Sequence, residues 1–117
     1  MLKFIDRTFG WLLVLASCGH TVGTLLWLPL MSGIFVWSMG SALAGVLLGV
    51  LNILRAGRPN DKAVAVITAI GTACWVLVAL AFGKSIEHLL DPRVVGHVVI
   101  AGVLVIFSLG TLRRLNG

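Results

Sequence analysis

The segment from residue 34 to residue 62, IFVWSMGSALAGVLLGVLNILRAGRPNDK, decides the fold of this chain. Its first part, residues 34–54, carries no charged side chain, and basic residues follow directly from Arg55 onward. A helix of about 20 residues spans the roughly 30 Å hydrocarbon core of a bilayer. A membrane-spanning strand needs only about 10 residues and alternates in polarity, which this segment does not. The pattern therefore predicts a transmembrane helix over residues 34–54 that ends in a polar turn.

Three further apolar runs have a similar length, and they cover residues 8–28, 63–83 and 93–112. The charged residues fall almost wholly between the runs, and the connections are short. Short connections make consecutive helices antiparallel neighbours. We therefore expect an all-α membrane protein in which residues 1–117 form one domain, an up-down-up-down bundle of four transmembrane helices. Asp61 and the pair Asp91-Pro92 are expected to begin the third and fourth helices.

The composition excludes several classes of protein. Hydrophobic residues make up 59% of the 117 residues, and charged residues only 11%. A soluble domain carries about 25% charged residues, so this chain has too few to cover a surface that meets water. That excludes an ordinary soluble enzyme and a disordered chain. The net charge of +5 does not indicate a nucleic-acid partner, because the nine basic residues lie between apolar runs and form no phosphate-binding patch.

Lysine and arginine are distributed unevenly between the two sides of the predicted bundle. The side with both termini carries seven of the nine basic residues, namely Lys3, Arg7, Arg55, Arg58, Lys62, Arg113 and Arg114. The other side carries only Lys84 and Arg93. Because basic residues concentrate in cytoplasmic segments, this asymmetry predicts that both termini are cytoplasmic.

One short motif near the N-terminus suggests a processing signal. Leu15-Ala16-Ser17-Cys18 is similar to the cleavage site of a lipoprotein signal, in which the cysteine becomes the lipidated N-terminus. The chain stays apolar for about a further ten residues, where a mature lipoprotein usually becomes polar. We therefore expect that this segment is retained as the first transmembrane helix.

Small residues indicate which helix faces lie inside the bundle, because lipid gives no hydrophobic drive for helix association. The second predicted helix carries them at steps of three and four: Ser38, Ser41, Gly45, Gly49 and Asn52. Comparable stripes are formed by Ala16, His20, Gly23, Thr24 and Trp27 in the first helix, Ala65, Ala69, Thr72, Ala79 and Gly83 in the third, and His97, Ala101, Ser108 and Thr111 in the fourth. We expect these faces to pack together. The Gly45/Gly49 pair is also a candidate face for a homo-dimer.

The candidate ligand-binding residues lie in the predicted outer half of the bundle. They are His20, Thr24 and Trp27 on one face of the first helix, Trp37 at the start of the second, and His97 on the fourth. An apolar pocket with a few convergent polar groups is the usual form of a small-molecule site. Binding is expected to depend on pH between about 5 and 8, where histidine titrates. Glu87, His88 and Asp91 are expected above this pocket; the alternative is a bundle that closes completely and leaves no cavity.

Two further hypotheses use the same histidines. His20 and His97 are candidate axial ligands of a haem, and the glycines beside them would let a porphyrin approach the backbone. The expected depths of the two histidines in the membrane differ by about 6 Å, which helix tilt would have to absorb. A metal site would need His88 as well, and the spacing matches no compact zinc signature. Cys18 and Cys74 lie inside predicted helices without a C-x-x-C partner, so we expect both to be buried.

The polar cluster after the second helix has two interpretations. Asn52, Arg55 and Arg58 are placed to contact a lipid head group or another anion at the cytoplasmic surface. The alternative is a set of charges that stops the helix, followed by a capped turn. The sequence has no catalytic triad, no paired carboxylates and no phosphate-binding loop, so it indicates no enzyme.

Several motifs together resemble small, uncharacterised four-span proteins of the bacterial inner membrane. These motifs are the run from Leu51 to Lys62, Gly19-His20, Trp37, Phe82-Gly83 and Asp91-Pro92-Arg93. The resemblance implies four helices in a bacterial cytoplasmic membrane and no assigned activity. We expect a non-catalytic membrane protein that binds a lipid, a small hydrophobic ligand or a partner subunit. The alternatives are a haem-binding electron carrier and a small transporter.

Overall fold

The computed structural model describes all 117 residues and contains four helices and no strand. They are α1 (Leu2–Trp27), α2 (Gly33–Gly57), α3 (Lys62–Ser85) and α4 (Pro92–Asn116). Each helix is long and apolar enough to cross a membrane. The molecule is elongated, with principal extents of 49 × 24 × 23 Å, and its long axis matches a bilayer of about 40–45 Å including the head groups. The expected all-helical architecture is therefore confirmed.

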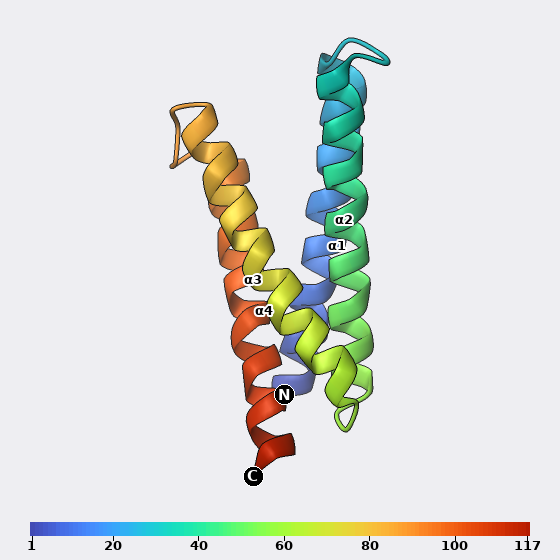
Figure 1. Ribbon diagram of the computed structural model, residues 1–117, viewed down its shortest axis with the longest axis vertical. Coiled ribbons are helices and arrows are strands. Elements are labelled where there is room, and N and C mark those ends of the chain that lie inside the picture. Colours follow the sequence, from blue (N-terminus) through green and yellow to red (C-terminus); the bar gives the residue numbers. More distant parts are fainter.

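The helices are arranged as two hairpins, α1/α2 and α3/α4 (Figure 1). Both chain termini lie toward the lower end of the view, termed the terminal end, together with the 58–61 turn. The hairpins diverge toward the opposite end, termed the open end, which carries the 28–32 and 86–91 loops. The molecule therefore has the shape of a V rather than of a closed cylinder.

Each helix extends beyond the apolar run that predicted it. The first begins at Leu2 rather than near residue 8, and the last continues to Asn116 rather than ending near residue 112. Apolar length marks the part that meets hydrocarbon, whereas lysine and arginine are good helix formers that continue the backbone hydrogen bonds into the polar region. The difference matters at the N-terminus, because it brings Asp6 into α1.

Side chains cap three of the four helix starts. Asp61 accepts a hydrogen bond from the Val64 amide at 3.1 Å, and Asp91, before Pro92, accepts one from the Arg93 amide at 2.9 Å. Both of these predicted caps are confirmed. Ser32 caps α2 in the same way, with its Oγ accepting from the Phe35 amide at 3.2 Å.

Glycines allow α1 and α2 to pack closely. A Cβ atom added at Gly49 would lie 2.9 Å from the Val14 amide nitrogen and 3.0 Å from the Gly10 carbonyl oxygen, and one at Gly45 would collide with Ser17. The small-residue face of α2 is therefore an interior face, as expected. In the single chain, residues of α1 pack against Gly45 and Gly49; the homo-dimer through this face stays a prediction.

The hairpins meet in a small apolar core near the middle of the helices. It consists of Leu13, Trp75, Ala101 and Leu104. Only 24 of the 117 residues are buried, and the exposed helix surface is dominated by large apolar side chains. An exposed apolar surface of this extent suits lipid rather than water.

Candidate functional site: a cleft between the hairpins above a buried polar network

A cleft of about 1040 Å³ lies between the two hairpins, from Trp75 up to the open end. All five residues predicted for ligand binding line it: His20, Thr24, Trp27, Trp37 and His97. Most of the remaining lining is apolar or small. The expected pocket therefore exists, and it is an open cleft rather than an enclosed cavity.

On the α1/α2 wall, His20, Thr24 and Ser38 form a cyclic set of hydrogen bonds. The His20 Nε2 lies 3.0 Å from the Ser38 Oγ, which lies 2.6 Å from the Thr24 Oγ1, and the Thr24 hydroxyl donates to the His20 carbonyl oxygen at 2.9 Å. Each hydroxyl has only one proton to donate. All three contacts are satisfied together when His20 carries its proton on Nε2 and donates it to Ser38, which then donates to Thr24. His20 is thus fixed in orientation.

Trp75 of α3 and His97 of α4 lie on the opposite wall of the cleft and contact each other. The Trp75 Nε1 donates to the His97 Nδ1 at 3.3 Å, and the rings meet edge to face with centroids 5.8 Å apart. Because an indole N–H can only donate, the His97 Nδ1 must be unprotonated and its Nε2 carries the proton. The Nε2–H of His97 has no partner within the protein, so it is free to donate to a ligand.

The rim of the cleft is aromatic and basic. Trp27 and Trp37 are 76% and 82% exposed, which places them at the edge of the cleft. On the other hairpin, Arg93 lies over the Phe82 ring at 5.7 Å and pairs with Asp91 at 2.8 Å. The side-chain hydrogen bond from Arg93 holds the pKa of the Asp91 carboxyl well below its usual range.

The connection between α3 and α4 covers the cleft less than expected. Ser85 and Ile86 line it, whereas Glu87, His88 and Asp91 do not. No three histidine, cysteine, aspartate or glutamate side chains lie close enough together to hold a metal ion, so the structure does not bring His20, His88 and His97 together. Cys18 and Cys74 are exposed, and the expectation that they are buried is wrong.

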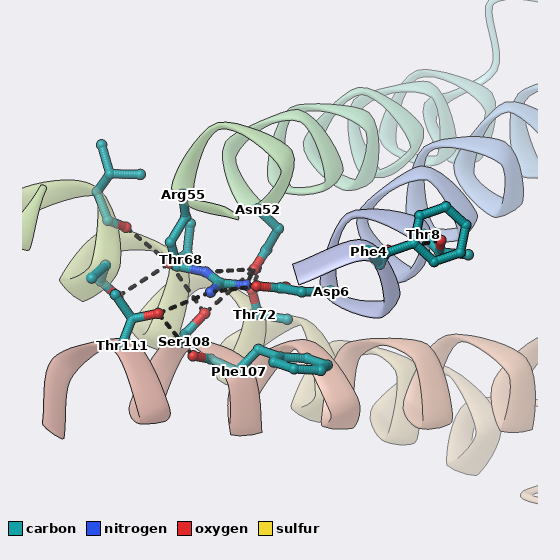
Figure 2. A network of polar contacts seen from close by, with 12 residues as sticks. Phe4, Asp6, Thr8, Asn52, Arg55, Thr68, Thr72, Phe107, Ser108 and Thr111 are labelled. Carbon is teal, nitrogen blue, oxygen red and sulfur yellow. Dashed lines mark hydrogen bonds and ion pairs between the residues drawn. The ribbon is translucent and has the colours of Figure 1, made fainter. Parts of the chain in front are cut away.

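Below the cleft, a buried ion pair joins α1 to α2. The Arg55 guanidinium donates to both carboxylate oxygens of Asp6 (Figure 2), at 2.5 and 3.0 Å. The Arg55 side chain is only 1% exposed. The Arg55 Nη1 also donates to the Thr111 Oγ1 at 3.1 Å. The Asn52 Oδ1 accepts from the remaining Arg55 donors at 3.3 and 3.4 Å. All five guanidinium protons therefore have acceptors within the bundle.

The network continues from Asn52 into the other hairpin. The Asn52 Nδ2 donates to the Thr72 Oγ1 at 3.0 Å, and the Ser108 Oγ lies 3.3 Å from the Asn52 Oδ1 and 3.2 Å from the Thr68 Oγ1. Figure 2 shows these side chains converging from all four helices. Hydrogen bonds of this kind hold transmembrane helices together, since the alternative is an unpaired polar group in hydrocarbon. The network therefore joins the hairpins at the terminal end.

This network corrects the interpretation of the polar cluster after the second predicted helix. Asn52 and Arg55 are buried and hydrogen-bond to one another, and Arg55 also pairs with Asp6, so neither side chain is placed to contact lipid head groups. Of the three predicted residues, only Arg58 is exposed. Sequence reasoning missed Asp6 because the first helix was expected to begin after it. In the structure Gly10, Leu13 and Ser17 are buried at steps of three and four, a face that sequence reasoning did not select; the same spacing continued one step toward the N-terminus reaches Asp6.

Comparison with known proteins adds no family: no protein-family model, no curated protein and no solved structure matches this chain.

Proposed function

We propose that this chain is a non-catalytic protein of the bacterial inner membrane that binds a lipid or another small hydrophobic ligand in the cleft between its hairpins. The observation that carries the proposal is the cleft itself. Its volume of about 1040 Å³ lies just above the usual range for small-molecule sites, which is about 300–1,000 Å³. Its walls are mostly apolar, with a few polar groups fixed in orientation.

The polar groups of the cleft favour an amphiphile with a hydrogen-bonding head. The free Nε2–H of His97 would donate to an oxygen of the ligand, and the hydroxyls of the His20 set, whose protons are already engaged, would accept a hydrogen bond beside it. The apolar part of the ligand would lie between α1 and α3. Because the hairpins diverge, such a ligand can enter from the bilayer without crossing water.

Orientation in the membrane is part of the same proposal. We infer an up-down-up-down bundle with both termini cytoplasmic, supported by the seven-to-two distribution of basic residues between the ends. The cleft then opens toward the outer leaflet. Reporter fusions at Gly117 and Gly33 should report inside and outside respectively; an external Gly117 would reverse the cleft and contradict the proposal.

Two glycines on α4 allow a matched test of ligand binding. Gly96 lines the cleft and Gly102 does not, and an added Cβ at either position meets nothing within 4 Å. Gly96→Trp should fill the cleft, whereas Gly102→Trp should only add a side chain elsewhere on α4. Native mass spectrometry of protein released from native membranes should show a bound small molecule in wild type and Gly102→Trp but not in Gly96→Trp. Equal occupancy in both variants would refute binding in the cleft.

Haem binding is the second candidate, and the location of both histidines on one cleft supports it. Haem ligation by His20 would have to displace Ser38 from the Nε2, whereas the Nε2 of His97 is free. The visible absorption spectrum of protein purified from haem-sufficient cells distinguishes the two candidates. A Soret band that is lost in His20→Ala and His97→Ala would favour the electron carrier over the lipid-binding protein.

A small transporter is the third candidate. The cleft opens at one end, while the Arg55 network joins the helices at the other, as in one state of an alternating-access protein. Ser41 lines the cleft, so Ser41→Cys, with both native cysteines replaced, tests access. If a membrane-impermeant maleimide labels the introduced cysteine only from the outer side, the result supports the ligand-binding protein. If the maleimide labels it from either side, the result supports a transporter.

A further inference from the structure

A second cavity, of about 440 Å³, lies at the terminal end and is separate from the cleft. The first turns of α1, the end of α2 and the last turns of α4 form its walls. Its charged residues are Lys3, Asp6, Arg55 and Arg114, and its apolar wall includes Ile106 and Phe107. The cavity therefore has three cationic side chains and one carboxylate.

The single carboxylate is already used. Asp6 gives both of its oxygens to Arg55, and that pair is buried at the back of the cavity. Lys3 forms no ion pair and no hydrogen bond. Arg114 forms no ion pair, and its one side-chain contact is a 3.4 Å hydrogen bond from Nη2 to the Thr111 Oγ1. Two cations on different helices therefore face a common space without a counter-charge.

We propose that this cavity binds an anionic phosphate group between Lys3 and Arg114. A guanidinium matches the geometry of phosphate oxygens, and an ammonium adds a compact point charge. The Arg55–Asp6 pair forms the back wall and takes no part in binding, because all of its donors are engaged. This inference does not rest on the occupancy of the cleft, and the residues involved are entirely different.

The same chemistry is offered by an anionic phospholipid and by free phosphate. The apolar wall favours the lipid, since Ile106 is 70% exposed and an acyl chain could lie against it. The position also suits the lipid, because the terminal end is the proposed cytoplasmic side, where anionic head groups attract basic residues. We therefore expect a phosphodiester head group such as that of phosphatidylglycerol.

The adjacent Arg113 provides a matched control for Arg114. Both arginines lie in the last turn of α4, but only Arg114 lines the cavity. Detergent-solubilised protein is titrated with phosphatidylglycerol and, separately, with phosphatidylcholine, and the bound lipid is counted by native mass spectrometry. Phosphatidylglycerol affinity should fall about fivefold in Lys3→Gln and again in Lys3→Gln/Arg114→Gln. It should stay near the wild-type value in Arg113→Gln.

Inorganic phosphate forms the second arm of the experiment. In one outcome, phosphate at millimolar concentration binds with the same dependence on Lys3 and Arg114 while phosphatidylglycerol is not selectively retained. That result would support the site and assign it to the soluble anion. Equal losses in Arg113→Gln and Arg114→Gln would show only general surface attraction and overturn the proposal. The Lys3 side chain contacts no partner within the protein, so Lys3→Gln should not disturb folding. An unchanged affinity for phosphatidylglycerol in this variant would overturn the proposal as well.

Discussion

Arg55 near the end of α2 and Asp6 near the start of α1 form the buried ion pair of this molecule, joined by two hydrogen bonds although 49 residues separate them. The guanidinium also reaches Thr111 of α4, so one side chain connects three helices. The pair lies where the hairpins meet, and the cleft lies where they diverge. The position of these two residues therefore determines which end of the bundle is held closed.

Removing one partner of this pair is expected to be strongly destabilising. Asp6→Ala would leave the Arg55 charge buried without its counter-ion, and Arg55→Leu would do the same to Asp6. The loss for a broken buried pair is about 3–5 kcal/mol. Unfolding by denaturant in lipid micelles, followed by circular dichroism, measures it. Arg58→Gln is the control, because Arg58 is exposed and three residues away on the chain.

The double variant Asp6→Leu/Arg55→Met separates the effect of charge from that of packing. It should be more stable than either single variant, since no unpaired charge remains. If the double variant were as unstable as the sum of the two single variants, the pair would not be coupled, contrary to the structure.

Close packing of α1 against α2 is expected to tolerate no side chain at Gly49. Gly49→Ala would place a methyl group against the backbone of Val14 and Gly10, which cannot move independently, and overpacking of this kind typically costs about 1–3 kcal/mol. Gly40→Ala, on the same helix, meets nothing within 4 Å and should leave the melting temperature unchanged or slightly raised. Equal melting temperatures for the two variants would show that α1 and α2 are further apart than described.

Ligand binding in the cleft is expected to weaken as the pH falls from 8 to 5. The ionisable groups that line the cleft are His20, His97 and Arg93. Protonation of His97 would remove the acceptor for Trp75 and place a second positive charge in an apolar cleft. The binding of N-phenyl-1-naphthylamine, a neutral apolar probe, measures the effect. His97→Gln keeps an acceptor that does not titrate, so its pH dependence should be smaller, whereas His88→Gln outside the cleft should match wild type.

The start of α4 is expected to keep its cap in mild acid. The Arg93 side chain lowers the pKa of Asp91, so the carboxylate contributes stability above the unfolded pKa of about 3.9 and loses it only as the pH falls through the lower folded value. Amide hydrogen exchange in the first turn of α4, corrected for intrinsic rates, should therefore be equally protected at pH 7 and pH 5. Asp91→Ala should lose that protection at both values, while Asp61→Ala should leave it unchanged. Loss of protection between pH 7 and pH 5 in wild type would contradict this account of the cap.

The helices and most of their interior faces could be predicted because each depends on local pattern. On α1 the predicted face is only partly right, since Asp6, Gly10, Leu13 and Ser17 are buried whereas Trp27 is 76% exposed. Ala65, Ala69, Thr72, Ala79 and Gly83 are all buried, as their spacing predicted, because the step of three and four places them on one helix face. Even the five cleft residues could be selected in this way, since depth and face follow from position along a helix.

The pairing of Asp6 with Arg55 and the divergence of the hairpins could not be predicted in the same way. The first depends on a partner far away in the chain, and the second on how two hairpins tilt against each other. Trp75 lies where the hairpins part: its indole lies beside Gly45, and it lines the cleft. Sequence periodicity shows which face such a side chain occupies, but it does not encode how far two hairpins tilt apart.

The central claim is that the hairpins are joined at the terminal end and separated at the open end. Spin labels at Leu30 and Leu90 measure the open end, and labels at Phe4 and Arg113 measure the terminal end, with Cys18 and Cys74 replaced in both variants. Pulsed electron paramagnetic resonance in lipid nanodiscs should give a clearly longer distance for the Leu30/Leu90 pair than for the Phe4/Arg113 pair. Similar, short distances for both pairs would show a closed four-helix cylinder, which has no cleft and therefore no ligand site.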